Sequence, residues 1–310
     1  MKGNRYDVII VGGSYAGLAA AMALGRALQN VLVIDEGKPC NAPTPYSHNF
    51  LTNDGRSPAE IAAVAKEQVM NYPGVQFLIG KAIGAKKEPD GFGIEVLSGE
   101  KFHAEKLVFA TGIRDILPDI EGLQVCWGKS VLHCPFCHGY EVRGRKTGVL
   151  LNNEKTFEFV KMIANWTKDL TLFTNGKANL STDQRDILLR KGIKVIEKRI
   201  QVVKQESGQI HEISFSDGTC YSLEVLYAPS PFEQHSTLPA ELGCAMTADG
   251  YIQIDEQYET TVKGIFAIGD NASRMRTVAN AVAMGTMAGM GLVKKLVEER
   301  FIDASSINRF

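Results

Sequence analysis

The sequence predicts an α/β fold made of two three-layer (ββα) domains, with the second domain inserted into the first. Three observations support this prediction. A strand, glycine-rich turn, helix and strand open the chain over residues 6–34, a second βαβ pattern begins near residue 147, and segments typical of the first domain return after about residue 242. We therefore expect a discontinuous domain at residues 1–117 plus 242–310, with an inserted domain at residues 118–241.

The first domain begins with a continuous apolar run, Tyr6–Val11, which is typical of a strand buried on both faces. A glycine-rich turn follows, then a helix rich in Ala and Leu to about Leu28 and a strand at Val31–Ile34. Further expected elements are helices at Pro58–Met70 and Ala279–Glu299 and strands at Gln76–Ile79, Gly93–Leu97, Lys106–Ala110, Ile252–Ile254 and Ile265–Ile268.

The inserted domain repeats this alternation of strands and helices. Its expected strands are Gly148–Leu151, Leu170–Thr174 and Lys194–Glu197, and its expected helices are Phe157–Trp166 and Thr182–Arg190. A hairpin then runs through Val202–Phe215 and Thr219–Val225. The two βαβ halves are therefore repeats of architecture and not of sequence.

Composition excludes several classes of function. Of 310 residues, 45% are apolar and 22% charged, and the net charge of −1 does not favour a nucleic-acid partner. The runs Ala16–Gly25 and Ala279–Val293 are too short or too small in side chain to span a membrane. No secretory signal precedes the first strand, so we expect a cytoplasmic protein. Among the six cysteines, Cys40, Cys126, Cys220 and Cys244 are scattered and read as packing residues.

The glycine-rich turn fits the needs of a dinucleotide and makes the first domain Rossmann-like. Gly12 permits a tight turn, and Gly17 lets the helix approach the strand closely. The helix N-terminus then presents free N–H groups to a pyrophosphate. Asp35 ends the second strand, where a carboxylate can bind ribose hydroxyls, whereas Ser14 stands in place of the usual middle glycine.

A second signature lies near the C-terminus. The strand within Thr261–Asp270 ends in Gly269-Asp270, so a carboxylate lies at the carboxyl end of the sheet and can bind a ribityl hydroxyl. Another strand ends in Ala110-Thr111-Gly112, a small turn that permits close approach. Together with the first turn, these signatures favour FAD over NAD as the ligand of the first domain.

The stretch Cys134-Pro135-Phe136-Cys137 places two thiols where they can form a reversible disulfide. A helix that starts at the pair lowers the pKa of one thiol through its dipole. His138 titrates near neutrality, and we hypothesise that it is the acid/base of thiol exchange. Glu141 either polarises His138 or is simply exposed.

Two other interpretations of this motif are less favoured. A zinc site would need two more ligands, and the sequence holds no second CxxC, so we expect no metal. Cys-x-x-Cys-His is also the attachment pattern of c-type haem, but that attachment takes place outside the cytoplasm, and no export signal is evident.

The inserted domain does not carry the usual features of a pyridine-nucleotide site. The turn after its first strand, Asn152–Phe157, contains no glycine. The segment Asn175–Asn179 contains no arginine for a 2′-phosphate and no acid for a ribose. We therefore predict weak or absent use of NADPH, so NADP(H) is not an expected cofactor.

Over its whole length the chain resembles the low-molecular-weight thioredoxin reductases and their thioredoxin-reductase-like relatives. The resemblance rests on Gly12–Gly17 with Asp35, on Ala110–Gly112, on Cys134–Cys137 and on Thr261–Asp270. It implies an FAD-binding discontinuous domain, an inserted domain that carries the CxxC pair, and a homodimer. Cys137 would be the sulfur beside the flavin, and Cys134 the sulfur that exchanges with the partner. Those reductases usually carry an acid directly after the second cysteine, where this chain has His138. The stretch Cys134–Glu141 resembles a branch that contains dithiol oxidases and uncharacterised reductases.

We therefore expect an FAD-dependent disulfide oxidoreductase that passes electrons between flavin, the Cys134/Cys137 pair and an external protein or small-molecule dithiol or disulfide. The alternatives are an NADPH-dependent thioredoxin reductase and a flavin redox sensor that does not turn over. A ferredoxin-like protein or oxygen can serve as the other electron partner. Asn49 is either a flavin contact or a loop cap. The expected cofactor contacts are Gly12, Ser14, Tyr15, Ala16, Gly17, Asp35, Lys38, Asn41, Asn49, Ala82, Thr111, Gly112, Gly269, Asp270, Thr277 and Val278.

Overall fold

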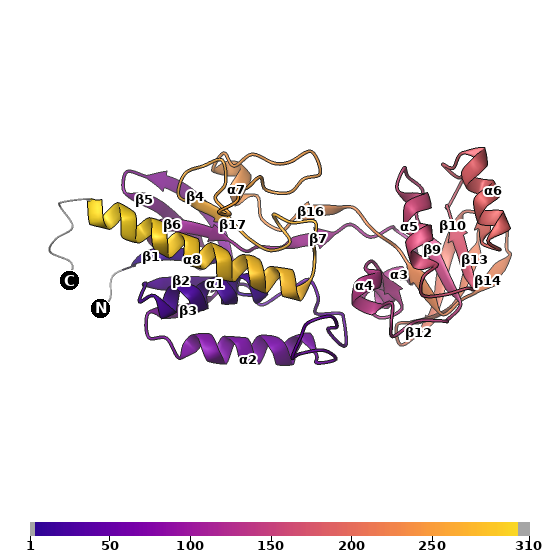
Figure 1. The fold of residues 1–310 in the computed structure, drawn as a ribbon, viewed down its shortest axis with the longest axis horizontal. Coiled ribbons are helices and arrows are strands. Elements are labelled where there is room, and N and C mark those ends of the chain that lie inside the picture. Colours follow the sequence, from indigo (N-terminus) through magenta and orange to yellow (C-terminus); the bar gives the residue numbers. More distant parts are fainter. Residues whose placement is uncertain (1–3, 303–310) are drawn as a thin grey trace. The chain divides into compact units, whose positions relative to one another are not determined.

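The computed structural model describes residues 4–302, and the chain divides into two compact units (Figure 1). The first unit contains the residues up to 42, residues 58–114 and the residues from 233 onward; the second contains residues 43–57 and 115–232. Three segments differ from the expected domain boundaries, and one of them is residues 115–117, which belong to the second unit and not to the first. Residues 43–57 belong to the second unit and residues 233–241 to the first, whereas the sequence analysis assigned them the other way round.

The first unit is built on a parallel sheet whose strand order is β3-β2-β1-β6, with β17 beside the end of β6. On its other edge the N-terminal half of β6 pairs with β5 of the antiparallel hairpin β4–β5, so the hairpin extends the same sheet. The strands are β1 (Arg5–Val11), β2 (Val31–Asp35), β3 (Val75–Ile79), β4 (Ala82–Glu88), β5 (Gly91–Val96), β6 (Lys101–Phe109) and β17 (Ile265–Ala267).

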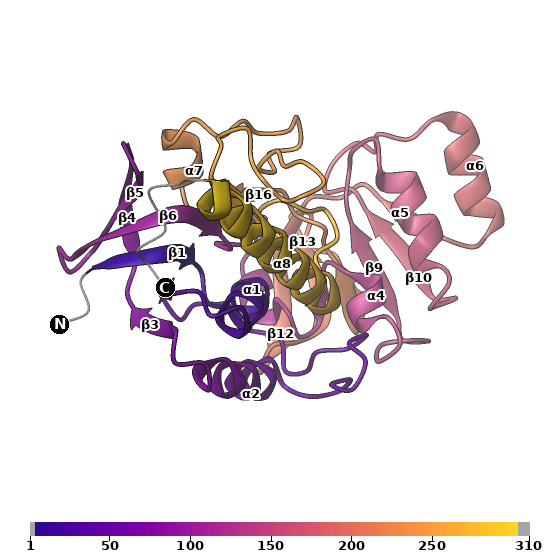
Figure 2. The same ribbon diagram turned by 60° about the vertical axis from the view of Figure 1, so that its left-hand side comes forward.

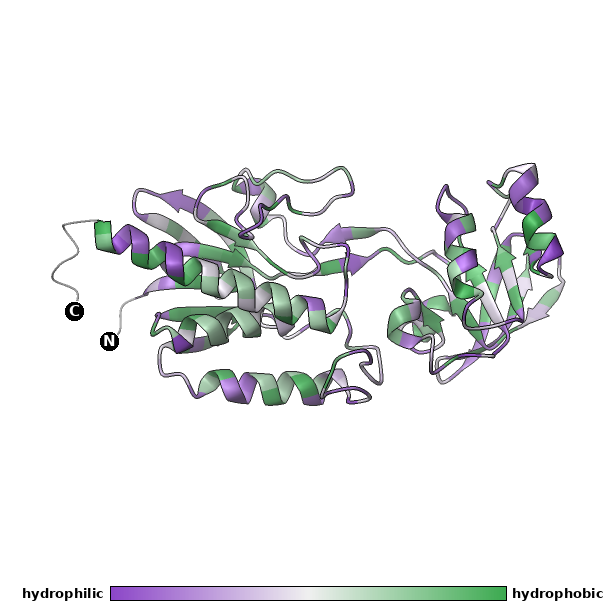
Figure 3. Cartoon of the chain, in the orientation of Figure 1, coloured by the Kyte–Doolittle hydropathy of each residue, from purple (hydrophilic) through white to green (hydrophobic). Residues whose placement is uncertain are grey.

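The central strands of this sheet are covered on both faces, as their unbroken apolar sequences predict. Ile9 lies beside Leu32 on one neighbouring strand and beside Leu107 on the other, and all three side chains are buried. In Figure 3 these strands carry hydrophobic colours. The parallel register brings the carboxyl ends of β1, β2, β6 and β17 to one edge of the sheet.

Two helices pack against each other along most of the length of the shorter one: α1 (Tyr15–Arg26) and α8 (Val278–Ile302). Figures 1 and 2 show them side by side. The contact depends on small residues, because a methyl group on Gly285 would lie 2.1 Å from the Ala16 carbonyl oxygen. Helix α2 (Pro58–Met70) also packs on α1, and the short helix α7 (Leu238–Glu241) lies near β4.

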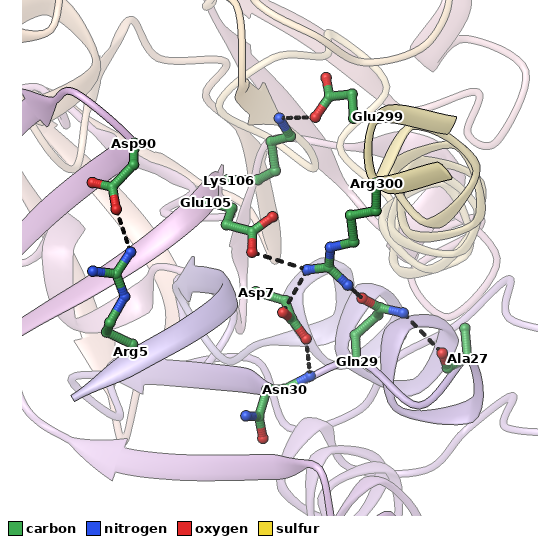
Figure 4. A network of polar contacts seen from close by, with 10 residues as sticks. All are labelled: Arg5, Asp7, Ala27, Gln29, Asn30, Asp90, Glu105, Lys106, Glu299 and Arg300. Atoms are coloured by element: carbon green, nitrogen blue, oxygen red, sulfur yellow. Dashed lines mark hydrogen bonds and ion pairs between the residues drawn. The ribbon is translucent and has the colours of Figure 1, made fainter. Parts of the chain in front are cut away.

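The C-terminal end of α8 is joined to the sheet by charged side chains (Figure 4). The Arg300 guanidinium pairs with Asp7 at 2.5 Å and with Glu105 at 3.2 Å. The Lys106 ammonium pairs with Glu299 at 2.5 Å. Because Lys106 is buried and Arg300 half-buried, these pairs are screened less than surface pairs and fix the end of the helix.

The second unit contains a parallel sheet in the order β11-β10-β9-β15-β8 and an antiparallel sheet in the order β12-β13-β14. Its helices are α3 (Leu123–Cys126), α4 (Pro135–His138), α5 (Thr156–Ile163) and α6 (Thr182–Arg190). Its strands are β8 (Val131–Leu132), β9 (Thr147–Leu150), β10 (Leu170–Phe173), β11 (Lys194–Ile196), β12 (Ile200–Glu206), β13 (Gln209–Phe215), β14 (Cys220–Ser222) and β15 (Val225–Tyr227). The short strand β16 (Phe232–Gln234) pairs with β7 (Ile113–Asp115), where the chain passes between the units.

The α/β prediction is confirmed, and three local expectations were wrong. Ile252–Ile254 is not a strand, because its residues make only isolated bridges, Met246 with Ile252 and Ile254 with Thr260. The helix expected at Phe157–Trp166 ends at Ile163. The last segment of the expected hairpin splits into β14 and β15, and β15 joins the parallel sheet. Over residues 4–302, no helix is long and apolar enough to cross a bilayer.

The glycines of α8 give a matched test of the packing between α1 and α8. A methyl group on Gly291 would meet open space, so Gly291→Ala should stabilise the helix by about 0.5–1 kcal/mol. Gly285→Ala gains the same helix propensity but collides with backbone, and it should lower the free energy of unfolding by about 1–3 kcal/mol. Urea titrations of both variants followed by circular dichroism measure the difference. Equal stabilities would contradict the packing described here.

Candidate active site

The glycine-rich turn between β1 and α1 is held by contacts from backbone to backbone. A methyl group on Gly17 would lie 1.9 Å from the Gly12 carbonyl oxygen, and one on Gly12 would lie 2.2 Å from the Ala110 carbonyl oxygen. Gly12 also has a φ of +107°, which other residues rarely adopt. These contacts bring the N-terminus of α1 to the edge of the sheet where β6 ends.

The N-terminus of α1 lacks a side-chain cap. Ser14 occupies the N-cap position in extended conformation and makes no capping hydrogen bond. The first N–H groups of a helix have no partner within the helix, so this end suits an anionic ligand. Asp35 supports the turn, since its Oδ1 atom accepts a hydrogen bond of 3.0 Å from the Gly13 N–H group.

A cavity of about 360 Å³ lies at this edge of the sheet. It contains five of the expected cofactor contacts, namely Gly12, Asp35, Lys38, Ala82 and Thr111. It is also lined by residues that the sequence analysis did not name: Val11, Ile34, Glu36, Gly80, Lys81, Ile83, His235, Ser236, Thr237 and Leu238. Glu36 pairs with Lys38 at 2.7 Å, and this partner lowers the pKa of the Glu36 carboxyl.

Several other expected contacts lie together beside the N-termini of α1 and α8. The Tyr15 hydroxyl accepts a hydrogen bond of 3.2 Å from the Asn41 amide and donates one of 3.2 Å to the Pro58 carbonyl. The Asp270 carboxylate lies 3.8 Å from the Arg276 guanidinium. The Thr277 hydroxyl accepts a hydrogen bond from the Asn280 N–H group at the start of α8.

Three of the expected contact residues are described by the position of their backbone. Gly112 and Gly269 have φ values of +65° and +83°, and a methyl group on Gly269 would lie 3.1 Å from the Ala16 side chain. Val278 is the first residue of α8. These positions therefore define the path of the chain at the sheet edge.

Asn49 lies in a different unit from the other expected cofactor contacts. It belongs to the second unit, within the segment Pro43–Ser57. It has a φ of +58°, and its N–H group donates a hydrogen bond of 2.7 Å to Asp54, which is a local loop contact. This hydrogen bond fits a loop role for Asn49, and its role as a flavin contact stays a prediction.

Sequence reasoning missed Asn271, a fully buried residue directly after the Gly-Asp signature. Its side-chain amide donates to the Phe109 carbonyl at 2.9 Å and to the Thr111 hydroxyl at 3.2 Å. Its backbone carbonyl accepts a hydrogen bond from Gln234. Asn271 therefore ties the end of β6 to the loop after β17, and its place after Gly269-Asp270 was the only signal in the sequence.

Taken together, these residues fit the ADP portion of a dinucleotide. An open helix N-terminus suits the pyrophosphate, and a carboxylate at the end of β2 suits a ribose. Gly13 lets the turn pass close to the end of β2, because an added methyl would lie 2.9 Å from the Asp35 side chain.

The second unit carries the redox pair. Cys134 and Cys137 form a disulfide whose Cα atoms are 5.4 Å apart. Cys134 is the N-cap of α4, and its sulfur accepts a hydrogen bond of 3.2 Å from the Cys137 N–H group. Pro135 at the first helical position favours this helix start. Both cysteines are half-buried, so an external thiol has access to the pair.

Aromatic side chains surround the disulfide. Phe136, between the cysteines, is 60% exposed and contacts the Trp166 ring edge-on at 5.7 Å between centroids. Gly139 packs on the same indole, since an added methyl would lie 2.8 Å from it. His133 stacks on Trp127 at 5.7 Å. His133 therefore packs on a ring next to the motif, and no group of three or more metal-ligating side chains occurs in residues 4–302.

His138 closes α4 and is half-buried. Burial lowers the pKa of its imidazole below the ordinary value, and the neighbouring His48 lowers this pKa further. Glu141 acts in the opposite direction. Because of the low pKa, His138 is neutral at neutral pH and able to accept a proton.

Comparison with known proteins identifies the class. The family model described as pyridine nucleotide-disulphide oxidoreductase matches residues 6–146 and 169–285, so the chain belongs to this family. It is therefore an oxidoreductase that acts on sulfur groups, and its family implies a flavin.

The chain is similar to proteins named thioredoxin reductase and to an oxidoreductase of known structure. Thioredoxin reductase tcpT of Claviceps purpurea is 32% identical over 92% of each chain. The putative thioredoxin reductase TrxB of Bacillus anthracis is 29% identical, with a TM-score of 0.91 over 95% of this chain and 100% of that one. An oxidoreductase from Agrobacterium tumefaciens is 36% identical, with a TM-score of 0.89 over 95% and 99%. The resemblance to thioredoxin reductases inferred from the motifs is confirmed.

Replacing Asp35 tests the candidate nucleotide site formed by the turn Gly12–Gly17 and the end of β2. Asp35→Ala removes the acceptor of the Gly13 N–H group and the acid at the end of β2, and flavin affinity should fall at least tenfold, by about 1.4 kcal/mol or more. Flavin absorbance after purification and dialysis measures the loss. The control is Asp90→Ala, which removes an exposed acid paired with Arg5 on the same unit and should retain flavin fully. Equal retention in both variants would contradict the assignment.

Proposed function

We propose that the protein is an FAD-dependent disulfide oxidoreductase whose Cys134/Cys137 pair exchanges electrons with an external dithiol or disulfide. FAD, when bound, supplies a two-electron acceptor and donor. The observation that supports the proposal best is the contrast between two ligand sites. The turn at Gly12–Gly17 has the glycines that a dinucleotide needs, whereas in the second unit the Asn152 side chain is hydrogen-bonded to the loop after β10.

Thiol exchange at the pair conserves atoms and electrons. An external thiolate attacks one sulfur of the disulfide, and a mixed disulfide forms as the bond between Cys134 and Cys137 breaks. The second external thiol then displaces Cys134, which leaves an oxidised product and a reduced pair. We assign Cys134 as the sulfur that forms the mixed disulfide and Cys137 as the sulfur on the flavin side, as the family resemblance implies.

His138 is the proposed acid/base for this exchange. The neutral imidazole accepts the proton of the incoming thiol and returns it to the leaving thiolate. Its position at the end of α4, one residue after Cys137, keeps it beside the pair. The lowered pKa of His138 favours the proton-accepting form at neutral pH.

The turn after β9, where a pyridine nucleotide would meet the second unit, is closed by asparagine side chains. The Asn152 carbonyl oxygen accepts from the Asn179 N–H group at 2.7 Å, and its amide donates to the Lys177 carbonyl at 3.0 Å. Asn153 accepts from the Lys155 N–H group at 2.9 Å. The Asn152 bonds join the loops after β9 and β10, and the Asn153 bond occupies the N–H group of the residue before α5, where a pyrophosphate would bind.

The acidic residue beside the loop after β10, Glu197, is also bonded within the protein. Glu197 accepts from the Ala178 N–H group at 2.6 Å and pairs with Arg185 at 2.7 Å. Arg185, which is near enough to meet a phosphate at this loop, is therefore already neutralised. The paired arginine holds the pKa of the Glu197 carboxyl below its ordinary value. These contacts support weak or absent use of NADPH.

An NADPH-dependent thioredoxin reductase is the second candidate, because relatives such as tcpT carry that reductase name and the family is named for pyridine nucleotides. Anaerobic mixing separates the two. We predict that micromolar NADPH leaves the flavin absorbance unchanged over minutes, whereas a small dithiol such as dithiothreitol bleaches it. Rapid bleaching by NADPH would favour the reductase; bleaching by neither reagent would favour a sensor that does not turn over.

The roles of the two sulfurs give a separate prediction. Cys137→Ser leaves Cys134 free to attack an external disulfide, and mass spectrometry should detect a stable mixed disulfide because no resolving thiol remains. Cys134→Ser should yield far less adduct. Both variants should lose dithiol turnover by at least about a hundredfold while binding flavin. Cys220→Ser, at an exposed cysteine of the same unit, should behave as wild type. Adducts on Cys137 alone would reverse the assignment.

A further inference from the structure

The segment Pro43–Ser57 lies between two stretches of the first unit in the sequence. In the structure it packs with the second unit, which carries the disulfide. Its fold is held by its own backbone: Ser47 and Arg56 pair as an antiparallel bridge, and the Ser47 carbonyl also accepts from the Gly55 N–H group at 2.9 Å. The segment contacts the turn at Gly128, where an added methyl would lie 3.0 Å from the Thr44 hydroxyl. It therefore presents fixed side chains to the second unit.

One of these side chains is His48, which is 18% exposed. Its ring meets the His138 ring edge-on, with centroids 6.5 Å apart and planes at 88°. Its Nδ1 atom lies 3.5 Å from a Glu141 carboxylate oxygen and 3.7 Å from an Asp54 carboxylate oxygen. The imidazole of His48 is thus placed between two carboxylates and the imidazole of His138.

The charged groups near His138 come from two segments. His48 comes from the segment Pro43–Ser57, with Asp54 facing it; Glu141 comes from the turn after α4. Tyr227, on β15, is buried, and the charge of Glu141 together with burial raises the pKa of its phenol. Glu141 therefore borders both the acid/base candidate and a buried neutral phenol.

Two imidazoles this close do not readily carry charge together. At 6.5 Å and an effective dielectric constant of about 20, two unit charges repel by an amount that changes a pKa by about one to two units before screening. A positive charge on His48 therefore disfavours a proton on His138, and the negative charge of Glu141 favours it.

We propose that His48 and Glu141 are positioning residues that set the protonation of His138 from opposite sides, and so set the pH at which thiol exchange begins. The inference rests on the proposed function, because it assumes that His138 accepts the thiol proton. The function of the segment Pro43–Ser57 is then to bring one charge-bearing ring to a redox pair that lies about 90 residues further along the chain.

The direction of each effect follows from the charges. Exchange requires neutral His138, so its rate rises with pH through the pKa of His138. His48→Phe keeps a ring but removes the repelling charge, so the pKa of His138 should rise and the rising limb should move to higher pH by about 0.5–1 unit. Glu141→Gln removes the attracting charge, and the limb should move to lower pH by a similar amount.

The experiment uses the full-chain flavin-loaded enzyme. Dithiol turnover between pH 5 and 9 is measured for wild type, His48→Phe, Glu141→Gln and the control His211→Phe, an exposed histidine of the same unit. We expect His48→Phe to lose rate at the acid end of this range, by at most about three- to tenfold, and little at pH 9, and Glu141→Gln to gain at the acid end. The control should follow the wild-type profile. The inference would be overturned if the pH–rate profiles of His48→Phe and Glu141→Gln moved in the same direction or did not move.

A second readout does not depend on turnover. Proton NMR titration of the histidines in the oxidised enzyme gives the pKa of His138 directly, with its signal assigned from His138→Gln. Opposite shifts of this pKa in His48→Phe and Glu141→Gln support the inference even if no dithiol is oxidised. Absence of dithiol oxidation would defeat the proposed function alone. Unchanged pKa values in both variants, with exchange intact, would defeat the inference alone.

Discussion

The approach of backbone to backbone at α1 is the constraint on which the first unit depends. Gly17 lies against the Gly12 carbonyl and Gly285 against the Ala16 carbonyl, so α1 is held in close backbone contact with the turn after β1 and with α8. Packing of this kind tolerates almost no added atoms. Because α1 cannot move, its N-terminus stays at the sheet edge where β1, β2, β6 and β17 end.

The geometry of the candidate nucleotide site follows from that close contact. The first half of α8 is held beside the start of α1, and Gly269 lies against Ala16 although the sequence separates these two residues by more than 250 positions. The site of the second unit does not depend on distant segments of the chain, because both cysteines of the redox pair lie within one short stretch of sequence. One short helix orients both sulfurs, with Cys134 as its cap.

Much of the fold could be predicted because local signals agreed with tertiary structure. The helix at Pro58–Met70 was placed at its observed ends, since Pro58 fits the first helical position and Pro73 lies shortly beyond the end. Ile252–Ile254 failed because alternating isoleucines predict a strand only when a neighbour pairs along its length, and here only single bridges form.

Candidate site residues could be named from the sequence where they belong to a motif of adjacent residues. Those that reach the site only through contacts between distant segments were missed. Gly12, Asp35 and Cys134–Cys137 stand in recognisable patterns. His235 lines the cavity although no motif surrounds it, and His48 reaches His138 through a loop assigned to the other domain. No pattern within either segment reports such a contact, because the packing of the loop decides it.

The central claim is that this chain stores electrons on its cysteine pair as well as on its flavin. An anaerobic titration of the purified yellow protein with dithionite tests this most directly. The account predicts that complete reduction takes about twice as many electrons per chain as Cys134→Ser takes, because a disulfide and a flavin each accept a pair. Equal electron counts in the two proteins would contradict it.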